Sequence, residues 1–487
     1  MKIPEIHILA ILPSVVLAVF GIAIMVVDPF LARTSRWITG WLALAGVAVA
    51  GLSATVLRSH FGLSYSNLWT VDEFTIFFHV VFLLIIGMTI LASMDFITRE
   101  NLPQGEYYAL LLFAGTGMLM MCGSNDLMMI FIGLEILSIA TYVLAGLRRT
   151  DLKSNESAMK YFLLGSFASA FFLYGTALVF GATGSTNLNA INIALTGPDI
   201  QITLAYLSAA LILIALCFKV AVAPFHIWTP DVYEGAPSPV TGFMSVGPKA
   251  AGFAVLFRIF LTAFPSLQHR WVDGIWVIAA LTMILGNVIA VAQPNIKRML
   301  AYSSIAHAGY IAVAFATSST QGVSAALFYL LAYSVMNLGA FTIITMLSRS
   351  EDKLVRISDY AGLGTKRPGL AALLSLFLLS LAGVPGTVGF AGKFFIFRSA
   401  VASDLVWLTV IGVVTTVISF YYYLSVIVQM YMHAPKEEFG NLRTAVSGNI
   451  ALFVAAAGTL YLGVLPSRVL EWTASAALGV LRELQIK

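Results

Sequence analysis

Apolar runs of about 20 residues recur from one end of the 487-residue chain to the other, and they constrain the fold more than any other feature. A helix of that length crosses a hydrocarbon core of roughly 30 Å, whereas the strands of a membrane barrel are shorter and alternate polar with apolar residues. Only 10% of the residues are charged, against roughly a quarter in an ordinary soluble domain. The sequence therefore predicts an all-α polytopic membrane protein.

The hydrophobic pattern predicts about fourteen spans, near residues 6–27, 37–57, 74–94, 106–122, 126–147, 157–181, 203–223, 238–264, 272–292, 298–316, 322–347, 369–401, 406–432 and 447–465. The twelfth is too long for one crossing and carries GVPGTVGFAG in its middle, so we expect two half-helices joined by an unwound segment. The seventh ends at Pro224, which lacks an N–H donor and obstructs the carbonyl one turn back, near Val220. The backbone groups freed there must find partners inside the protein.

The two interrupted spans lie five positions apart, and an odd offset reverses the direction of crossing. Spans 4–8 and 9–13 are therefore predicted to form two five-helix units related by an inverted repeat, with broken spans 7 and 12. The predicted organisation is an N-terminal three-helix segment (1–105), a first repeat (106–264), a second repeat (265–435), and a last span with a C-terminal interfacial helix (436–487). Interrupted spans at matching positions of two halves are typical of a transport path.

The placement of lysine and arginine in short loops predicts the orientation, because cytoplasmic loops carry an excess of them. One set of loops holds few, chiefly Arg58, Arg270 and Arg398. The other set is basic: Arg33, Arg36, Arg99, Arg148, Arg149, Lys153, Lys297, Arg298, Arg349, Lys353, Arg356, Lys366, Arg367, Lys436 and Arg443. A cytoplasmic position for the basic set places both termini on the outer side. The tail SRVLEWTASAALGVLRELQIK has helically spaced apolar residues, as in a helix lying on the outer interface or on a neighbour.

Four ionisable side chains fall well inside apolar spans: Glu135, Lys219, Lys249 and Lys393. Each costs roughly 2.5–3.5 kcal/mol at a bilayer centre, so together they cost on the order of 10 kcal/mol, comparable to the net stability of a whole protein. Burial disfavours the charged form of a lysine and a nearby carboxylate favours it. Three such lysines in spans 7, 8 and 12 would form stations of a proton relay in the membrane plane, with Glu135 setting the affinity of the first.

Other titratable groups could connect these stations. His226, which follows Pro224, could bridge Lys219 to Lys249, and His307 in YSSIAHAGY could link Lys249 to Lys393. For each, a purely structural histidine is an equally good interpretation. Lys160 lies one turn into its span from the cytoplasmic side and either snorkels or feeds protons inward.

The composition gives the chain no redox or nucleotide site of its own. Cys122 and Cys217 lie about a hundred residues apart in apolar runs, too few for an iron–sulfur, zinc or CxxC site. GxGxxG and Walker patterns after a strand are absent from the sequence. We therefore expect neither a cofactor nor a metal bound by this chain.

At these residues the sequence resembles the antiporter-like membrane subunits of NADH:quinone oxidoreductase, respiratory complex I. The resemblance covers nearly the whole chain and is strongest in LEILSIATYVL, KVAVAPFHIWTPDVYEGAPSPVTGF, NIKRMLAYSSIAHAGY and LAGVPGTVGFAGKF. The family's proton-transfer glutamate and lysines fall on Glu135, Lys219, Lys249 and Lys393. Two features favour the N-type subunit of this family over its paralogues. The tail after the last span is short, and position 393 is a lysine where the M-type subunit looks to have a glutamate.

The resemblance implies a proton-exporting subunit in a bacterial inner membrane. It implies NADH, FMN, iron–sulfur clusters and quinone in partner subunits, and it implies the K and M subunits and their neighbours, with membrane lipid, as partners; no nucleic acid partner is expected. Two alternatives remain open at this point. One is a subunit of a cation/proton antiporter or membrane-bound hydrogenase, and the other is a scaffold in which Glu135 and Lys219 form a buried structural ion pair while the other lysines snorkel or bond free carbonyls.

Overall fold

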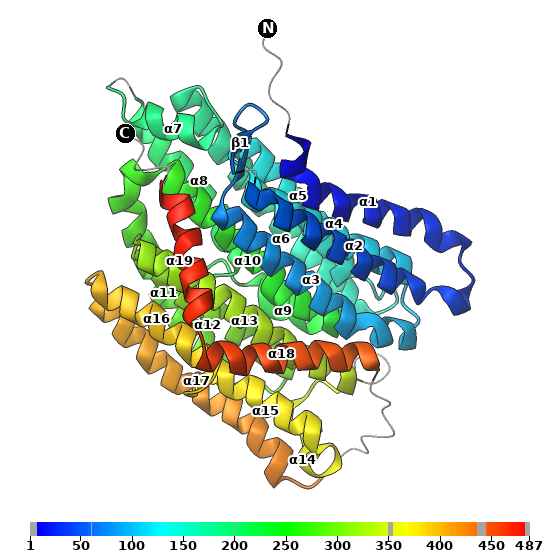
Figure 1. The fold of residues 1–487 in the computed structure, drawn as a ribbon. Helices are drawn as coiled ribbons and strands as arrows, with labels where there is room; N and C mark the ends of the chain where they lie inside the picture. Colours follow the sequence, from blue (N-terminus) through cyan, green and yellow to red (C-terminus); the bar gives the residue numbers. More distant parts are fainter. Residues whose placement is uncertain (1–6, 60, 199, 349–353, 436–444, 483–487) are drawn as a thin grey trace.

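The computed structural model describes residues 7–59, 61–198, 200–348, 354–435 and 445–482, and these residues are nearly all helical (Figure 1). Within them, thirteen helices are long and apolar enough to cross a membrane. They are Ile8–Phe30, which contains α1 (Leu12–Val27) and its flanking 3-10 turns, α2 (Ile38–Val56), α3 (Glu73–Arg99), α4 (Gln104–Gly123), α5 (Leu127–Ala145), α6 (Leu152–Thr183), α8 (Ile202–Val220), α10 (Ser238–Thr262), Pro265–Val291, which contains α11 (Gln268–Val291), α12 (Ile296–Ala316), α13 (Thr320–Leu347), α17 (Val406–Met432) and α18 (Val446–Val464). The prediction of an all-α multi-pass membrane protein is confirmed.

The predicted break in the twelfth span is confirmed. The span consists of α15 (Pro368–Ala382) and α16 (Val388–Ala402), each too short to cross a membrane alone. Gly383 ends α15 at φ 97° and Gly386 follows at φ 86°, a backbone region in which glycine pays no steric penalty. If α15 and α16 are counted as one interrupted crossing, the described residues contain fourteen crossings, as predicted.

The seventh span is interrupted as predicted. Helix α8 ends at Val220, Ala221 adopts a left-handed conformation at φ 59°, and a short helix α9 (Trp228–Gly235) follows. The freed backbone groups find partners inside the protein: Val222 N–H donates to the Cys217 carbonyl at 3.1 Å, and Ala223 N–H donates to Thr282 Oγ1 of α11 at 2.9 Å. The matching breaks are consistent with an inverted repeat, which stays a prediction, as do the four domain boundaries.

Side-chain caps begin several of the helices in and around the site. Asp72, Asp126 and Asn295 accept hydrogen bonds from backbone N–H groups in the first turns of α3, α5 and α12, respectively. Such caps satisfy donors that have no partner within the helix, and each stabilises its helix by about 1 kcal/mol. The polar residues between the apolar runs therefore fix where these helices start.

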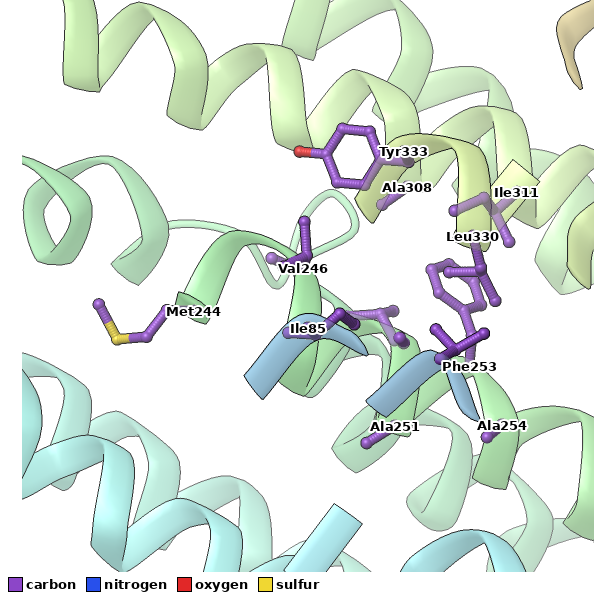
Figure 2. Close-up of a cluster of buried hydrophobic side chains, with 14 of the residues drawn as sticks. Ile85, Met244, Val246, Ala251, Phe253, Ala254, Ala308, Ile311, Leu330 and Tyr333 are labelled. Carbon is purple, nitrogen blue, oxygen red and sulfur yellow. The ribbon is translucent and has the colours of Figure 1, made fainter. Parts of the chain in front are cut away.

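Helix α10 is the centre of the bundle, because every one of its residues is buried. Figure 2 shows side chains of α10 packed among those of α3, α12 and α13. The labelled members of this cluster are Ile85, Met244, Val246, Ala251, Phe253, Ala254, Ala308, Ile311, Leu330 and Tyr333. The helix that carries Lys249 is thus the one most completely enclosed by protein.

The C-terminal helix α19 (Ser467–Arg482) crosses the direction of the long helices (Figure 1). It lies against this chain's own α3 and α13: the ring centroids of Trp472 and Phe77 are 5.0 Å apart, and Thr473 and Ser324 share a hydrogen bond of 2.9 Å. Its last predicted residues, 483–487, lie outside the described residues. The tail therefore forms the predicted helix, and it packs on the bundle to which it belongs.

Several small elements were not predicted. They are the hairpin of β1 (Gly62–Ser64) and β2 (Trp69–Val71), the helices α7 (Leu188–Leu195), α9 and α14 (Leu363–Lys366), and short 3-10 turns at Ile8–Ile11, Asp28–Phe30, Arg33–Ser35, Leu57–Ser59, Pro265–Leu267 and Ile357–Tyr360. All lie in or beside connections between spans, where a hydrophobicity pattern carries little information. The hairpin is the one departure from an all-α fold within the part of the chain that the structure describes.

Residues of the predicted basic loops meet at one end of the bundle. Arg36, Arg148, Arg149 and Lys153 line one cavity of about 1170 Å³. Arg298 and Lys153 both contact Glu234. Arg349, Lys353, Lys436 and Arg443 lie outside the described residues. The shared location supports a common side for these loops.

Candidate functional site

Lys219 lies in the last turn of α8, two residues before the break at Ala221. Its side chain is 4% exposed, and its ammonium donates to the hydroxyl of Ser138 on α5 at 2.8 Å. The ring of Tyr161 lies 5.9 Å from the same nitrogen. The C-terminal end of a helix attracts a cation, and the break leaves carbonyl groups free nearby. The position therefore stabilises a buried ammonium without a directly bonded carboxylate.

Glu135 is connected to Lys219 indirectly. The carboxylate, half-buried on α5, accepts a hydrogen bond from the hydroxyl of Ser169 on α6 and makes no direct ion pair with Lys219 within the described ranges. A small cavity of about 10 Å³, lined by Ser138, Ser169 and Lys219, separates the two hydrogen bonds. This is close to the smallest volume that holds one water. In the described ranges, Glu135 and Lys219 therefore each bond to a different serine hydroxyl instead of forming the direct ion pair of the scaffold interpretation.

Lys249 lies on α10, directly after Pro248, and is 3% exposed. Its ammonium donates to the carbonyl oxygen of Ser304 on α12 at 2.8 Å and also contacts the Ser304 hydroxyl. Gly252, one turn further along α10, faces Lys219: a Cβ built on this glycine would lie 3.5 Å from Lys219 Cγ. The lysine of α8 thus packs against the turn of α10 that follows Lys249.

His307 lies in a cluster of tyrosines and is 1% exposed. Its Nδ1 lies 2.6 Å from the hydroxyl of Tyr329, and its Nε2 lies 3.1 Å from the hydroxyl of Tyr423, which also contacts the Ser303 hydroxyl. Ser303 and the acceptor of Lys249, Ser304, are neighbours on the turn of α12 that precedes His307. Hydroxyl and imidazole groups therefore continue from the acceptor of Lys249 towards α13 and α17.

Lys393 lies just beyond the break between α15 and α16 and is 4% exposed. Its ammonium donates to the carbonyls of Leu381 and Ala382, each at 3.0 Å, and lies 4.8 Å from the ring centroid of Tyr310. These carbonyls end α15 and have no acceptor role within the helix. Tyr310 in turn packs edge-on against His307, with ring centroids 5.7 Å apart. One aromatic ring therefore separates His307 from Lys393.

The remaining predicted residues are placed differently. His226 lies between α8 and α9 with no hydrogen bond from its ring to Lys219 or Lys249 in the described part of the chain, and its Nδ1 is a buried atom without a partner there. Lys160 forms ion pairs of 2.7 Å with both Asp231 and Glu156. The structure thus brings Glu135, Lys219, Lys249, His307 and Lys393 into one region, while His226 interacts with Lys249 only electrostatically and not through a hydrogen bond in the described residues.

Lys160 belongs to an ion network at the end of the bundle. Asp231, on α9, also pairs with Arg298 at 2.6 Å, and the network borders a cavity of about 130 Å³. Burial alone would raise the pKa of Asp231, but hydrogen bonds from Lys160 and Arg298 hold that pKa below its ordinary value. Asp231 is therefore ionised at neutral pH and neutralises two cations.

Sequence reasoning missed the hydroxyl groups of this region. Ser138, Ser304, Tyr329 and Tyr423 all bond to a predicted site residue. Serine in apolar helices usually bonds to its own helix, so its presence carries no signal alone. The clustering of polar residues in YSSIAHAGY and the run of tyrosines at 421–423 are the signals that could have identified part of the set.

No group of three or more His, Cys, Asp or Glu side chains in the described ranges is placed to hold a metal ion. Cys122 and Cys217 are buried free thiols on different helices. The chemistry that the described region offers is hydrogen bonding and proton exchange among lysine, histidine, carboxylate and hydroxyl groups.

Comparison with known proteins places this geometry in a family. The family described as NADH:quinone oxidoreductase/Mrp antiporter, TM, matches residues 124–419. NADH-quinone oxidoreductase subunit N of Trichlorobacter lovleyi is 46% identical over 467 residues, which cover 96% of each chain. A chain of the structure of respiratory complex I from Thermus thermophilus with bound aureothin is 35% identical, with a TM-score of 0.80 over 95% of this chain and 99% of that one.

The Mrp complex from Dietzia sp. DQ12-45-1b contains a chain with a TM-score of 0.84 over 98% of both chains, at 20% identity. That likeness concerns the fold alone. The predicted resemblance to the membrane subunits of NADH:quinone oxidoreductase is confirmed by these matches.

Proposed function

We propose that this chain, which belongs to the family of NADH-quinone oxidoreductase subunit N, translocates protons across the membrane while quinone is reduced elsewhere in the complex. The redox groups, namely NADH, FMN, iron–sulfur clusters and quinone, belong in this proposal to partner subunits. The expected partners are the neighbouring membrane-arm subunits, K and M among them, and membrane lipid. The direction is from the cytoplasm to the outer side of a bacterial inner membrane, with both termini outside.

One observation carries the proposal. Lys219, Lys249 and Lys393 are each at most 4% exposed, and within the described ranges their ammonium groups donate only to neutral oxygens of Ser138, Ser304 and the α15 carbonyls. A lysine kept for structure alone is normally paired with a carboxylate, because an uncompensated buried charge is strongly destabilising. Neutral acceptors stabilise either protonation state, which is what a proton-carrying group needs.

The proposed path follows the contacts in order. Glu135 bonds to Ser169, which lines the small cavity beside Lys219, and Lys219 packs against α10 one turn from Lys249. From Ser304 the hydroxyl groups of Ser303 and Tyr423 lead to His307, and Tyr310 separates His307 from Lys393. Moving one charge against the membrane potential requires about 2.3 kcal/mol per 100 mV. Electrostatic changes at Glu135 and Lys219, imposed by neighbouring subunits, would supply that work.

The alternative of a cation/proton antiporter subunit has weaker support. The subunit N relative is 46% identical along nearly the full length, whereas the chain of the Mrp complex from Dietzia sp. shares the fold at 20% identity. Lys160 and the ion network around Asp231 are proposed to gather protons at the cytoplasmic end, because the cavity beside them opens among charged groups.

The test is quinone-coupled proton pumping in membranes that carry Glu135→Ala or Lys219→Met, normalised to complex content on native gels. The expected result is normal assembly with pumping lost or slowed at least tenfold per complex, which corresponds to about 1.4 kcal/mol in an activation free energy. Lys366→Met, a change at an exposed lysine at the end of α14, is the matched control. Unchanged pumping in assembled Lys219→Met complex would refute the relay, and lost assembly would favour the scaffold interpretation.

A further inference from the structure

Arg258 is an ionised side chain inside the bundle that the proposed relay does not use. It lies near the end of α10 and is 0% exposed. Its guanidinium donates to both carboxylate oxygens of Asp72, at 2.5 and 3.0 Å, to the hydroxyl of Thr75 at 2.8 Å, and to the carbonyl of Cys122 at 3.1 Å. Two parallel bonds to a carboxylate fix the guanidinium plane as well as its charge.

These contacts join three helices. Asp72 is also the N-cap of α3, where it accepts from the Thr75 N–H at 2.7 Å, and Cys122 lies in the last turn of α4. Burial alone would raise the pKa of Asp72, but the charge and hydrogen bonds of Arg258 hold that pKa below its ordinary value. The carboxylate is therefore ionised, and one ion pair fastens the ends of α3, α4 and α10 together.

The opposite side of α10 carries Lys249. Arg258 lies nine positions after Lys249, which is about 13 Å along the helix and about two and a half turns, so the two side chains project from opposite faces. Their partners agree with this, because Lys249 bonds to α12 and Arg258 bonds to α3 and α4. A shift of α10 at Arg258 would therefore move Lys249 relative to Ser304.

Helix α10 is weakened directly before Lys249. Pro248 has no N–H to donate to the carbonyl of Met244, and the hydroxyl of Tyr233 on α9 bonds to that carbonyl instead, at 3.1 Å. The half of α10 that carries Lys249 therefore lacks one backbone hydrogen bond to the half that precedes it. Near the C-terminal end of the same half, Arg258 holds the helix in place through its ion pair with Asp72.

We propose that Arg258 and Asp72 are positioning residues that hold the second half of α10 so that the ammonium of Lys249 stays on Ser304. This rests on the proposed relay function. Asp72 precedes both the predicted first repeat and residues 124–419, which match the family. The N-terminal segment therefore acts on the relay through this ion pair, in addition to covering the bundle.

The first experiment uses Arg258→Lys in the full membrane-bound complex. Lysine keeps the charge but cannot form the paired bonds to Asp72, so α10 loses its fixed position. We expect normal complex content and about tenfold slower proton pumping per complex, since small misplacements of reacting groups cost this much or more. Arg148→Lys is the matched control: Arg148 is 9% exposed, bonds to Glu100 at 2.9 Å, and has no hydrogen bond to α10 in the described residues. Equal slowing in both variants would overturn the proposal.

A double-mutant cycle separates positioning from general weakening. If Arg258 acts through the Lys249–Ser304 contact, Arg258→Lys slows pumping by a smaller factor in a Ser304→Ala background than in the wild type. The same factor in both backgrounds would overturn the proposal. Lys249→Met tests the relay itself: pumping that survives Lys249→Met refutes the proposed function, whereas pumping lost in Lys249→Met but normal in Arg258→Lys refutes only the positioning role.

Asp72→Asn provides the second variant in case Arg258→Lys does not assemble. Asparagine is an equally good helix cap, so α3 keeps its first turn while Arg258 loses its counter-charge. Assembled Asp72→Asn complex with slowed pumping supports the proposal, and assembled complex with wild-type pumping overturns it. Loss of assembly in both variants also overturns it, because the ion pair would then be structural.

Discussion

Tyr423 offers a sharp test of the hydroxyl and imidazole cluster, because its neighbour on the same helix serves as a control. Tyr423→Phe removes the hydroxyl that lies 3.1 Å from His307 Nε2 and that also contacts Ser303. Tyr422→Phe removes a hydroxyl that donates to Asn287 Oδ1 at 3.0 Å. Both rings are almost completely buried, at 0% and 2% exposed, so both changes delete one oxygen from a packed interior.

The magnitudes follow from the contacts. Each buried group left without a partner costs about 1–3 kcal/mol, so both variants are expected to lose stability, and Tyr423→Phe loses more because it orphans two groups. For proton transfer, losing one neutral hydrogen bond of about 1.4 kcal/mol on the path corresponds to about a tenfold slower rate. The bond from Tyr329 to His307 Nδ1, at 2.6 Å, remains and limits the loss.

The assay is quinone-coupled proton pumping per assembled complex, with complex content measured on native gels at 25 °C. The expected result is slowed pumping for Tyr423→Phe and nearly normal pumping for Tyr422→Phe. If the two variants pump equally well per complex, the path from Ser304 through Tyr423 to His307 is wrong, and the tyrosines serve only to pack the core.

Two further predictions concern structure and pH. Gly389→Ala should destabilise the folded chain by more than about 4 kcal/mol, because the new Cβ would overlap the Ser380 carbonyl oxygen. Complex content on native gels should therefore fall severely. Gly369→Ala, where nothing lies within 4 Å, should assemble normally, and equal content of the two variants would contradict the packing of α15 on α16. Asp231→Asn should lower the thermal dissociation midpoint of the complex from about pH 5 to 8. The loss should correspond to about 0.2–1 kcal/mol for each ion pair that Asp231 makes. Because the folded-state pKa of Asp231 is lowered, the difference from the wild type should be complete above about pH 4 and should disappear as the pH falls through that lowered pKa, and a difference that grows on acidification would contradict the charge assignment.

Periodicity and helix-breaking residues were enough to predict the crossings and both interruptions. Pro224 and the GVPGTVGFAG segment act locally, through a missing donor and through glycine conformations, so their effect is visible without the fold. The same reasoning identified Glu135 and the three lysines, since a charge in an apolar span is conspicuous in any context.

What could not be predicted depends on contacts between helices. Ser304 is a partner of Lys249 because α12 packs beside α10, and Tyr423 is a partner of His307 because α17 packs beside α12. The sequence does not show which helices pack together. Arg258 lies near the end of its predicted span, where an arginine commonly reaches water, so the sequence alone does not indicate its burial. The structure instead encloses it completely and pairs it with Asp72.

The packing of α19 has a consequence for the order in which the chain can be completed. Trp472 and Gly479 of α19 lie against Phe77 and the first residues of α3, so α19 covers a helix that is synthesised long before it. Domains commonly fold from the N-terminus as the chain emerges. Here α3 reaches the membrane roughly four hundred residues before its cover exists, at a synthesis rate of about 5–20 residues per second. For tens of seconds the nascent chain must therefore keep that face of α3 against lipid, an insertion factor or another subunit.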